Sequence, residues 1–440
     1  MERKAEPDFK KFIIFWLSQS VSQLGSAMTS FALTIWAYQQ TNSAMAVSLI
    51  TFCSYFPYIL ISIFAGSFID KNSKKKIMLI ADLFAAVCSV FILILFSTGS
   101  LHIYHIYIVN TITGFMDAFQ APAEAVAIGM MVPSDKYAKA SGYSSFSENL
   151  LTVVAPMLAA TFISFVGLGG IIFFDLLTFI FAFVVLLFFI KLPENTSSQE
   201  ESVLDGCKEG FSFLKKNRGI LYIILSMALL NFFSRLTYEN ILSPMLLART
   251  NNNNEILGLV SSILGIGGII GGLLVAGKKN GYKDNLKLIY FSAAFSFLFG
   301  DLLMGLSQNV YLWSIAALAA SIPIPFVIAG QKTIMYNTVP QNLQGRVFAV
   351  RNAIQFCTIP IGILLGGFLA DYVFEPFMLG SKSILAVFLR KLVGTGSGSG
   401  MAVMFLCTGI LGSTSSILLY NNRNVKLLRD INPKNKQFIQ

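Results

Sequence analysis

Charged residues are scarce in this chain. Only 12% of its 440 residues are Asp, Glu, Lys or Arg, whereas 55% are hydrophobic. An ordinary soluble domain has roughly 25% charged residues. Too few polar side chains are present to cover the surface of a soluble protein of this length. The composition therefore predicts an integral membrane protein.

Histidine and closely spaced cysteine pairs are also lacking. The sequence has two histidines and five cysteines, and the cysteines are scattered along the chain. These counts exclude a disulfide framework and argue against a metal site, because such sites need several ligands at short, regular spacing. No nucleophile and base stand in a spacing that indicates catalysis. We expect no metal, no cofactor and no enzymatic activity.

The basic balance does not indicate nucleic acid. The net charge is +10, but nucleic-acid binding needs Lys and Arg gathered on one polar face. Here these residues lie in short loops between apolar runs. We therefore expect no nucleic-acid partner.

Long apolar runs replace the missing polar surface. About 20 apolar residues span a bilayer as a helix, and in lipid the backbone must satisfy its own hydrogen bonds, which favours helices. We predict an all-α membrane protein with twelve transmembrane helices in two six-helix, pseudo-symmetric bundles. The predicted spans are 12–38, 45–69, 76–98, 102–131, 140–166, 169–191, 219–248, 255–277, 286–306, 309–338, 345–373 and 401–420.

Lys and Arg are divided unequally between the two sides of the membrane. The side of both termini holds 27 of the 32, and the opposite loops hold Arg249, Lys382, Arg390 and Lys391. Positive charge stays on the cytoplasmic side of short loops. Both termini are therefore expected to be cytoplasmic.

Two halves of the chain are related to one another. "MMVPSDKYAKASGY" follows the fourth span and "NTVPQNLQGRVFAV" follows the tenth, with an offset of 207 residues between Pro133 and Pro340. We predict a first bundle at 1–191, a cytoplasmic linker with an amphipathic helix at 192–218, and a second bundle at 219–440. The second bundle includes an extracytoplasmic loop at 374–400, with a short helix at the outer interface.

Several motifs match a known family. "GSFIDKNSKKKIM" resembles the loop signature G-x-x-x-D-[RK]-x-x-x-[RK] of the major facilitator superfamily, with Gly66, Asp70, Lys71 and Lys75 in place. "SQLGSAMTSFALTIWAYQQTNSA" and "LQGRVFAV" are similar to the macrolide-efflux-like branch of its drug:proton antiporters. The antiporter motif G-P-x-x-G-G of this family is replaced by "APMLAA" at Ala155–Ala160, whose small residues still permit close helix packing.

The resemblance implies a function and a gate. It implies a monomer in a bacterial inner membrane that exports lipophilic small molecules by alternating access, coupled to protons. It also implies that Asp70 latches the cytoplasmic side against the start of span eleven, at Gly345–Arg346. A carboxylate near a helix N-terminus gains roughly 0.3–1 kcal/mol. The lysines beside Asp70 also fit a simpler role, in which they are solvated and only fix the orientation of the chain in the membrane.

Two acids in span four are candidates for coupling. Asp117 and Glu124 lie about two helical turns apart on nearly the same face, with Pro122 between them. An acid within a membrane span is a functional hypothesis by default, and burial favours its neutral form. Asp117 either takes part in proton coupling or substrate binding, or makes a hydrogen bond that only stabilises the fold. Glu124 corresponds by the offset to the residue before Lys332, so it pairs with Lys332 or reaches the headgroups.

Other polar residues within spans are weaker candidates. Arg235 and Glu239 stand four residues apart, and they either neutralise each other or meet substrate. Glu148 and Asp175 are lower candidates, and Asp301 is expected near the outer surface. Span one carries a polar stripe that lines a cavity or makes helix contacts; its cavity-lining candidates are Gln19, Ser22, Gln23 and Ser26.

Three functions remain open. The leading hypothesis is a proton-coupled exporter of drug-like or macrolide-like compounds. The second is a lipid or siderophore translocator of the same fold, in which the 374–400 segment guides an amphiphile. The third is a membrane sensor that transports nothing.

Overall fold

The structure, a computed structural model, describes residues 8–190, 192, 203–278, 284–340 and 343–426. All regular elements in these ranges are helices. The chain forms two compact units. Residues 1–200 and 252–262 make the first unit, and residues 201–251 and 263–440 make the second.

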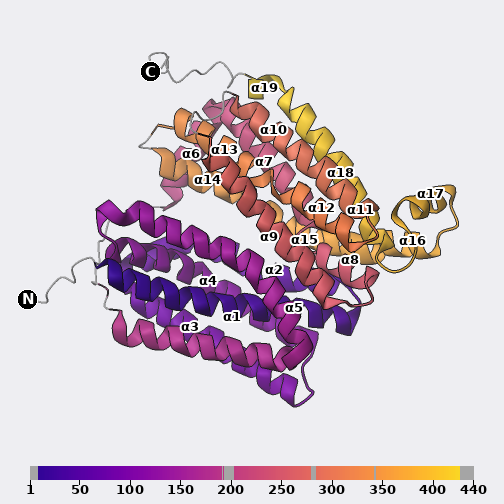
Figure 1. Ribbon diagram of the computed structural model, residues 1–440. Helices are drawn as coiled ribbons and strands as arrows, with labels where there is room; N and C mark the ends of the chain where they lie inside the picture. The colour runs from indigo at the N-terminus through magenta and orange to yellow at the C-terminus, as the bar shows by residue number, and fades with distance from the viewer. Residues whose placement is uncertain (1–7, 191, 193–202, 279–283, 341–342, 427–440) are drawn as a thin grey trace, which may run out of the picture. The chain divides into compact units, whose positions relative to one another are not determined.

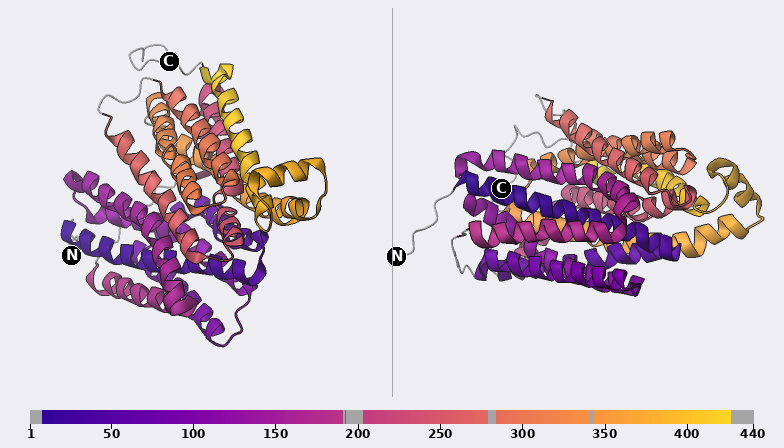
Figure 2. Two further views of the ribbon diagram at one scale, coloured as in Figure 1. Left: turned by 45° about the vertical axis from the view of Figure 1, so that its right-hand side comes forward. Right: turned by 60° about the horizontal axis from the view of Figure 1, so that its bottom comes forward.

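The first unit is a bundle of long helices that lie side by side (Figures 1 and 2). It ends with the first half of a helix that begins at Asn254. The elements are α1 (Phe9–Thr41), α2 (Ala44–Lys71), α3 (Lys74–Ser97), α4 (Ile103–Met131), the short 3₁₀ turn η1 (Ser134–Lys136), α5 (Tyr137–Val184), the π-helical η2 (Val185–Phe189) and the start of α9 (Asn254–Ala276). These boundaries agree with the predicted spans to within about three residues, η2 included.

Helix α5 contains two predicted spans. Its helical geometry breaks at Gly167, where φ is 67° and ψ is −177°. This conformation is accessible essentially only to glycine, so the backbone can turn sharply without a long loop. The break lies between the predicted spans 140–166 and 169–191, and each arm is long enough to cross a bilayer.

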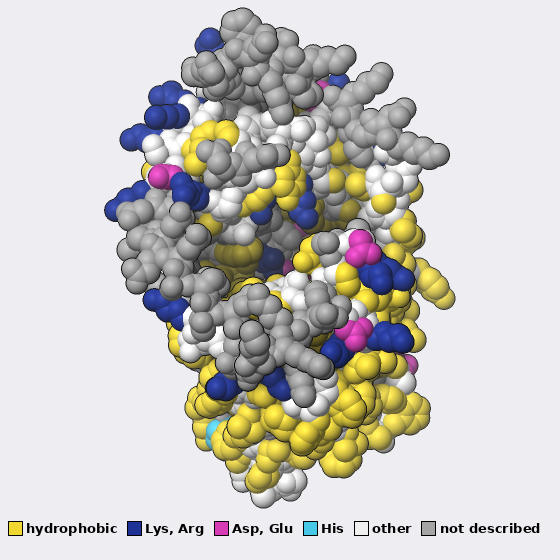
Figure 3. Space-filling view, turned by 90° about the vertical axis from the view of Figure 1, so that its left-hand side faces the viewer, with side chains coloured by type: hydrophobic (Ala, Val, Ile, Leu, Met, Phe, Trp, Pro, Cys, Tyr) yellow, Lys and Arg dark blue, Asp and Glu magenta, His cyan; other side chains and the backbone are white. Residues whose placement is uncertain are grey.

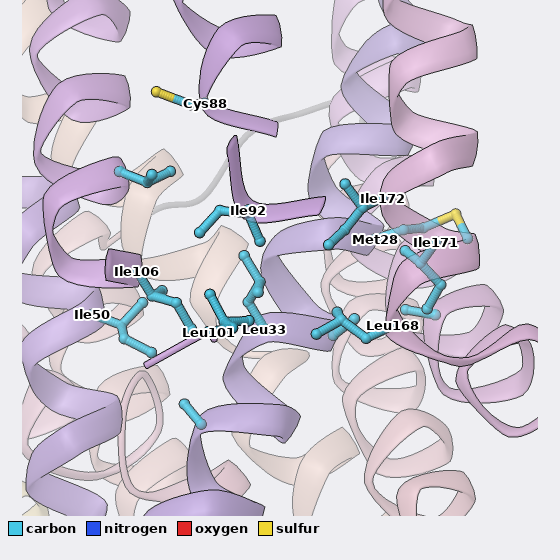
Figure 4. Packing of buried hydrophobic residues seen from close by; sticks show 14 of the residues in the cluster. Met28, Leu33, Ile50, Cys88, Ile92, Leu101, Ile106, Leu168, Ile171 and Ile172 are labelled. Atoms are coloured by element: carbon cyan, nitrogen blue, oxygen red, sulfur yellow. The ribbon is translucent and has the colours of Figure 1, made fainter. Parts of the chain in front are cut away.

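The core of the first unit joins all five of its long helices. Helix α1 packs along α5, and α4 packs against α2 and α3. Figure 4 shows the apolar cluster at this junction, to which Met28, Ile50, Ile92, Ile106 and Ile172 belong. In a bilayer such side chains stabilise the bundle through close van der Waals packing, because lipid tails are as apolar as the side chains themselves.

The second unit has more interrupted helices. Several predicted spans consist of two or three consecutive helical pieces, some joined by π-helical segments, which occur where a helix carries an extra residue per turn. The elements are α6 (Val203–Lys216), α7 (Arg218–Thr237), α8 (Leu242–Arg249), the rest of α9, α10 (Asn285–Phe295), η3 (Ser296–Asp301), α11 (Leu302–Leu306), α12 (Val310–Ser321), α13 (Ile324–Thr338), α14 (Gln344–Phe356), α15 (Thr358–Leu369), η5 (Ala370–Phe374), α16 (Glu375–Gly380), α17 (Ile384–Val393), α18 (Ser399–Tyr420) and α19 (Arg423–Lys426).

Two amphipathic helices lie outside the predicted spans. Helix α6 buries Leu214 completely against helices of the second unit, while Phe211 stays 54% exposed. Its apolar face is therefore covered partly by protein, where the sequence indicated the membrane surface alone. Helix α17 projects from the bundle of the second unit with α16 (Figure 2), and Ile384 is 91% exposed there.

Apolar side chains also cover much of the outer surface (Figure 3). Phe165 is 80% exposed and Phe188 70%, which a lipid environment would favour. Nine helical stretches in the described ranges are long and apolar enough to cross a membrane. Helices α1 and α4, at the predicted first and fourth spans, are not among those nine, because polar residues lower their mean hydropathy.

Candidate functional site

Acidic side chains gather on three neighbouring helices of the first unit. Asp82 comes from α3, Asp117 and Glu124 from α4, and Glu148 from α5. Asp82 is 7% exposed and accepts a hydrogen bond of 2.6 Å from the Gln120 side chain on α4. Its other oxygen, Oδ2, has no hydrogen-bond partner among the described residues. We call Asp82, Asp117, Glu124 and Glu148 the acidic group.

The members of the acidic group are close enough to repel one another. Asp82 interacts electrostatically with Asp117, and Glu124 with both Asp82 and Glu148. Asp117 and Glu148 are exposed at the surface of the unit, and Glu124 is half-buried. Within the described part of the chain, none of the four forms an ion pair with Lys or Arg. The same ranges hold no group of three His, Cys, Asp or Glu that could bind a metal ion.

Asp82 is a site residue that the sequence reasoning missed. It lies within the predicted span 76–98, so the signal that identified Asp117, an acid inside an apolar run, was present for it too. Its amide partner Gln120 lies on α4, one turn beyond Asp117. Only packing of α3 against α4 joins these residues.

A close contact positions α4. A methyl group placed on Gly114 would lie 2.1 Å from the backbone oxygen of Ser54 on α2. A residue with any side chain would push the two helices apart. Asp117 follows Gly114 by almost one turn, so this contact holds the acid at its depth along the bundle. Pro122 lies inside the same helix, which runs from Ile103 to Met131.

The predicted polar stripe of α1 does not face in a single direction. Gln19 is 4% exposed, and its Nε2 atom has no hydrogen-bond partner in the described ranges. Ser22 is half-buried, and Gln23 and Ser26 are exposed. Ser26 donates a hydrogen bond of 3.0 Å to Asp175 on α5. That Ser22, Gln23 and Ser26 line a cavity thus remains a prediction. Gln19, in contrast, is buried inside the bundle.

Asp301 is buried inside the second unit. It is 1% exposed, and its expected depth near the outer side of the membrane remains a prediction. Its Oδ2 atom accepts hydrogen bonds from Thr408 at 2.7 Å and Thr237 at 3.4 Å. These hydroxyls come from α18 and α7, so two neighbouring helices supply the polar contacts that a buried carboxyl needs.

The expected gate residues are only partly visible. Gly66 and Asp70 lie on α2, but their surroundings and the Asp70 side chain fall outside the described part of the structure. Lys71 is exposed at the end of α2. Lys75 donates hydrogen bonds to the backbone oxygens of Leu187, at 2.8 Å, and Ile190, at 2.7 Å. Lys75 therefore binds the end of η2, where backbone carbonyls lack helical partners.

Arg346, the other residue of the predicted gate, forms an ion pair with Glu209 of α6. Helix α6 approaches α14 closely there, because a methyl group on Gly210 would lie 2.6 Å from the Arg346 backbone oxygen. The amphipathic linker helix is thus attached to the start of α14. No feature of the sequence predicted this contact between α6 and α14.

The remaining charged candidates divide between the two units. Arg235 and Glu239 form an ion pair at the end of α7, so the structure brings these two together. Lys332 is exposed on α13 of the second unit. Glu124 belongs to the first unit, and its pairing with Lys332 remains a prediction.

The replaced antiporter motif packs closely. A methyl group on Gly258 of α9 would lie 2.4 Å from the Ala160 Cβ atom and 3.0 Å from the Pro156 backbone oxygen. Ser262, one turn further along α9, donates a hydrogen bond of 2.7 Å to the Val153 backbone oxygen. Alanine in place of the family's glycine therefore still permits close contact, because glycine stands on the partner helix.

Arg249 organises a second polar feature, in the second unit. Its guanidinium donates to the backbone oxygens of Ser307 and Gly398, at 3.1 and 3.3 Å, and to that of Val393. A cavity of about 280 Å³ lies beside it, with Gln308 and Trp313 in its wall. The guanidinium of Arg249 donates to three backbone carbonyls. It thereby holds the segment that follows α17 against the helices of the second unit.

Comparisons with known proteins agree with this architecture. Macrolide efflux protein A of Streptococcus pyogenes is 26% identical over 367 residues, which cover 82% of this chain and 89% of that protein. The Multidrug efflux pump Tap of Mycolicibacterium fortuitum is 24% identical over 370 residues, covering 79% and 86%. The solved structure of the nucleoside transporter NupG superposes with a TM-score of 0.67 at 11% identity, covering 94% of this chain and 100% of that one.

The family follows from these matches. The sequence pattern of the Major Facilitator Superfamily matches residues 15–362. This confirms the resemblance inferred from the loop signature, the helical membrane fold and the expectation of a transporter rather than an enzyme. The chain is a multi-pass membrane transporter that belongs to the Major Facilitator Superfamily.

Proposed function

We propose that this transporter exports lipophilic small molecules, of the drug or macrolide-like class, by alternating access coupled to inward movement of protons. Its similarity to a protein named for macrolide efflux and to a multidrug efflux pump supports the cargo class. The acidic group carries the coupling proposal, because it places four carboxylates on α3, α4 and α5 of one bundle.

The chemistry of the acidic group suits exchange. Like charges at this spacing disfavour ionising all four carboxylates together. A proton on Asp117 or Asp82 relieves the repulsion, and a positively charged group on a substrate relieves it as well. The two ligands therefore compete, which couples release of one to binding of the other. Asp117 is exposed where a substrate can reach it, and Gln120 orients Asp82 behind it.

The membrane topology and the gate complete the proposal. Bundles at 1–191 and 219–440, joined by the linker 192–218, would alternate between two conformations of a monomer in the inner membrane of a bacterium, with both termini cytoplasmic. Asp70 would bind the start of span eleven near Arg346 when the cytoplasmic side closes, and Glu124 would then pair with Lys332. A Glu124→Lys, Lys332→Glu double variant more active than either single variant would support the pair.

Transport in proteoliposomes with an imposed pH gradient tests the function. A fluorescent lipophilic cation serves as the probe, and its addition should drive proton flux in the wild type. Asp117→Asn should abolish this flux. Glu255→Gln changes an exposed acid in the first turn of α9, away from the acidic group, and should leave it intact. Equal proton flux in Asp117→Asn and wild type would refute coupling through Asp117.

A lipid or siderophore translocator is the second candidate function. Helix α17 favours it, because Ile384, Leu385 and Phe388 are 91%, 59% and 55% exposed on a helix that ends in Arg390 and Lys391. Such a helix lies readily at a membrane surface and could guide an amphiphile. Lipid movement in the same proteoliposomes without a pH gradient would favour this candidate, and no flux of any cargo would favour a sensor.

A further inference from the structure

Asp175 stands at a junction of three helices in the first unit, apart from the acidic group. The Ser26 hydroxyl of α1 donates to its Oδ1 atom at 3.0 Å, and the Ser89 hydroxyl of α3 donates to its Oδ2 atom at 3.2 Å. Asp175 itself comes from the second arm of α5 and is 4% exposed. Each carboxylate oxygen therefore has one hydroxyl from a different helix.

The charge of this carboxylate is not balanced. Asp175 makes no ion pair with any residue in the described ranges. A buried charge is strongly unfavourable unless a counter-charge or another compensating interaction accompanies it. The neutral hydroxyls of Ser26 and Ser89 supply hydrogen bonds but no positive charge. A single positive charge at the junction, carried by a proton or by a cation, would balance the carboxylate.

A third hydroxyl indicates where a ligand would lie. Thr29, one helical turn from Gly25 on α1, faces the Asp175 carboxylate. It is 8% exposed, and its interaction with the Asp175 carboxylate falls short of a well-formed hydrogen bond, because no residue that the structure describes meets hydrogen-bond geometry at its Oγ1 atom. A buried hydroxyl rarely stays unsatisfied. Its oxygen has lone pairs available for a cation.

The packing of α1 on α5 is shaped for this junction. A methyl group on Gly25 would lie 2.4 Å from the Thr178 hydroxyl oxygen and 3.0 Å from Asp175 Oδ1. Thr178 donates its own hydrogen bond to the Asp175 backbone oxygen at 2.8 Å. Glycine therefore allows α1 to bring Ser26 and Thr29 against the acid, and any larger residue would separate them.

We propose that Asp175, Ser26, Thr29 and Ser89 form a binding site for a monovalent alkali cation the size of Na⁺. All the ligand atoms are carboxylate or hydroxyl oxygens, which hard cations prefer. One carboxylate matches a single positive charge, whereas affinity for Ca²⁺ rises with the number of charged ligands. On binding, the hydroxyl hydrogens turn away and the oxygens face the ion.

A second carboxylate junction in the other unit provides a contrast. Asp301, Thr237 and Thr408 are 1%, 0% and 4% exposed, so each member of that junction is enclosed, and both hydroxyls contact the carboxylate. At the Asp175 junction Ser26 is exposed, which leaves a route for an ion. The same residue types thus make a sealed junction in one unit and an accessible one in the other.

Ion-dependent thermal unfolding of the purified full chain in detergent tests the site. The probe is NaCl exchanged for choline chloride at constant ionic strength, with KCl, LiCl and CaCl₂ as further arms. The wild type should show a saturable rise in unfolding midpoint with Na⁺, by about 3 °C near 100 times the dissociation constant. Asp175→Asn should lose this rise, and Asp301→Asn should keep it.

A milder variant keeps the test valid if Asp175→Asn fails to fold. Thr29→Val preserves the shape and the carboxylate and removes one ligand, so the Na⁺ concentration at half-saturation should rise by about tenfold. Glu255→Gln, at the surface, should match wild type. The same midpoint in choline and all alkali salts, an unchanged Na⁺ response in Thr29→Val, or stabilisation by Ca²⁺ alone would overturn the proposal. No step of the test depends on drug export.

Discussion

Replacement of Gly114 by alanine probes the contact that positions the acidic group. The new methyl group would lie 2.1 Å from the Ser54 backbone oxygen. Ordinary contacts between non-bonded heavy atoms lie near 3.5–4.0 Å, so α4 and α2 must separate by roughly 1.5 Å. A backbone oxygen cannot rotate away as a side chain can. The two helices must therefore move, and Asp117 moves with α4.

The expected loss can be estimated from overpacking. Forcing a methyl group into a packed interior costs about 1–3 kcal/mol. The gain in helix propensity from glycine to alanine offsets up to about 1 kcal/mol of this. For a unit of roughly 200 residues, the remainder of up to about 2 kcal/mol corresponds to a fall in unfolding midpoint of up to roughly 8 °C. Substrate-driven proton flux should fall as well, since the acid is displaced.

Gly129→Ala is the matched control on the same helix. Nothing lies within 4 Å of a methyl group at Gly129. This variant therefore has the higher helix propensity of alanine without a steric clash. Both variants are compared with wild type by thermal unfolding in detergent at one scan rate, because membrane proteins often unfold irreversibly. If Gly114→Ala is as stable and active as Gly129→Ala, close contact of α4 with α2 does not position Asp117.

Two further predictions concern the backbone and the ion pair of α7. Gly167→Ala should destabilise the protein by about 1–3 kcal/mol, since φ at this position is 67°. Thermal unfolding measures the loss. Gly142→Ala is the control, because Gly142 has open space and no positive φ, and equal stability of the two variants would contradict the prediction. Glu239→Arg should lower the unfolding midpoint by placing like charges together, and Arg235→Glu in the same chain should restore it. A double variant no more stable than Glu239→Arg would show that the pair adds nothing.

The positions of the spans, the loop signature and the amphipathic character of α6 and α17 followed from the sequence alone. Each depends on local composition: an apolar run long enough for a bilayer, the loop signature around Gly66 and Lys75, or alternation of apolar and basic residues as in α6 and α17. The break at Gly167 was also foreseen to within a residue or two, because apolar length limits each helix.

The partners of the polar residues depended on the tertiary structure. When a span is apolar on all sides, its sequence does not indicate which side faces the other helices. The hydrogen bonds of Asp82 with Gln120 and of Asp301 with Thr408 could therefore not be predicted. Arg346 likewise pairs with Glu209, far away in the chain. The sequence determines which residues enter the membrane, since hydropathy is local, whereas helix packing decides which of them touch, since contact depends on how neighbouring helices are rotated and how closely small residues let them approach.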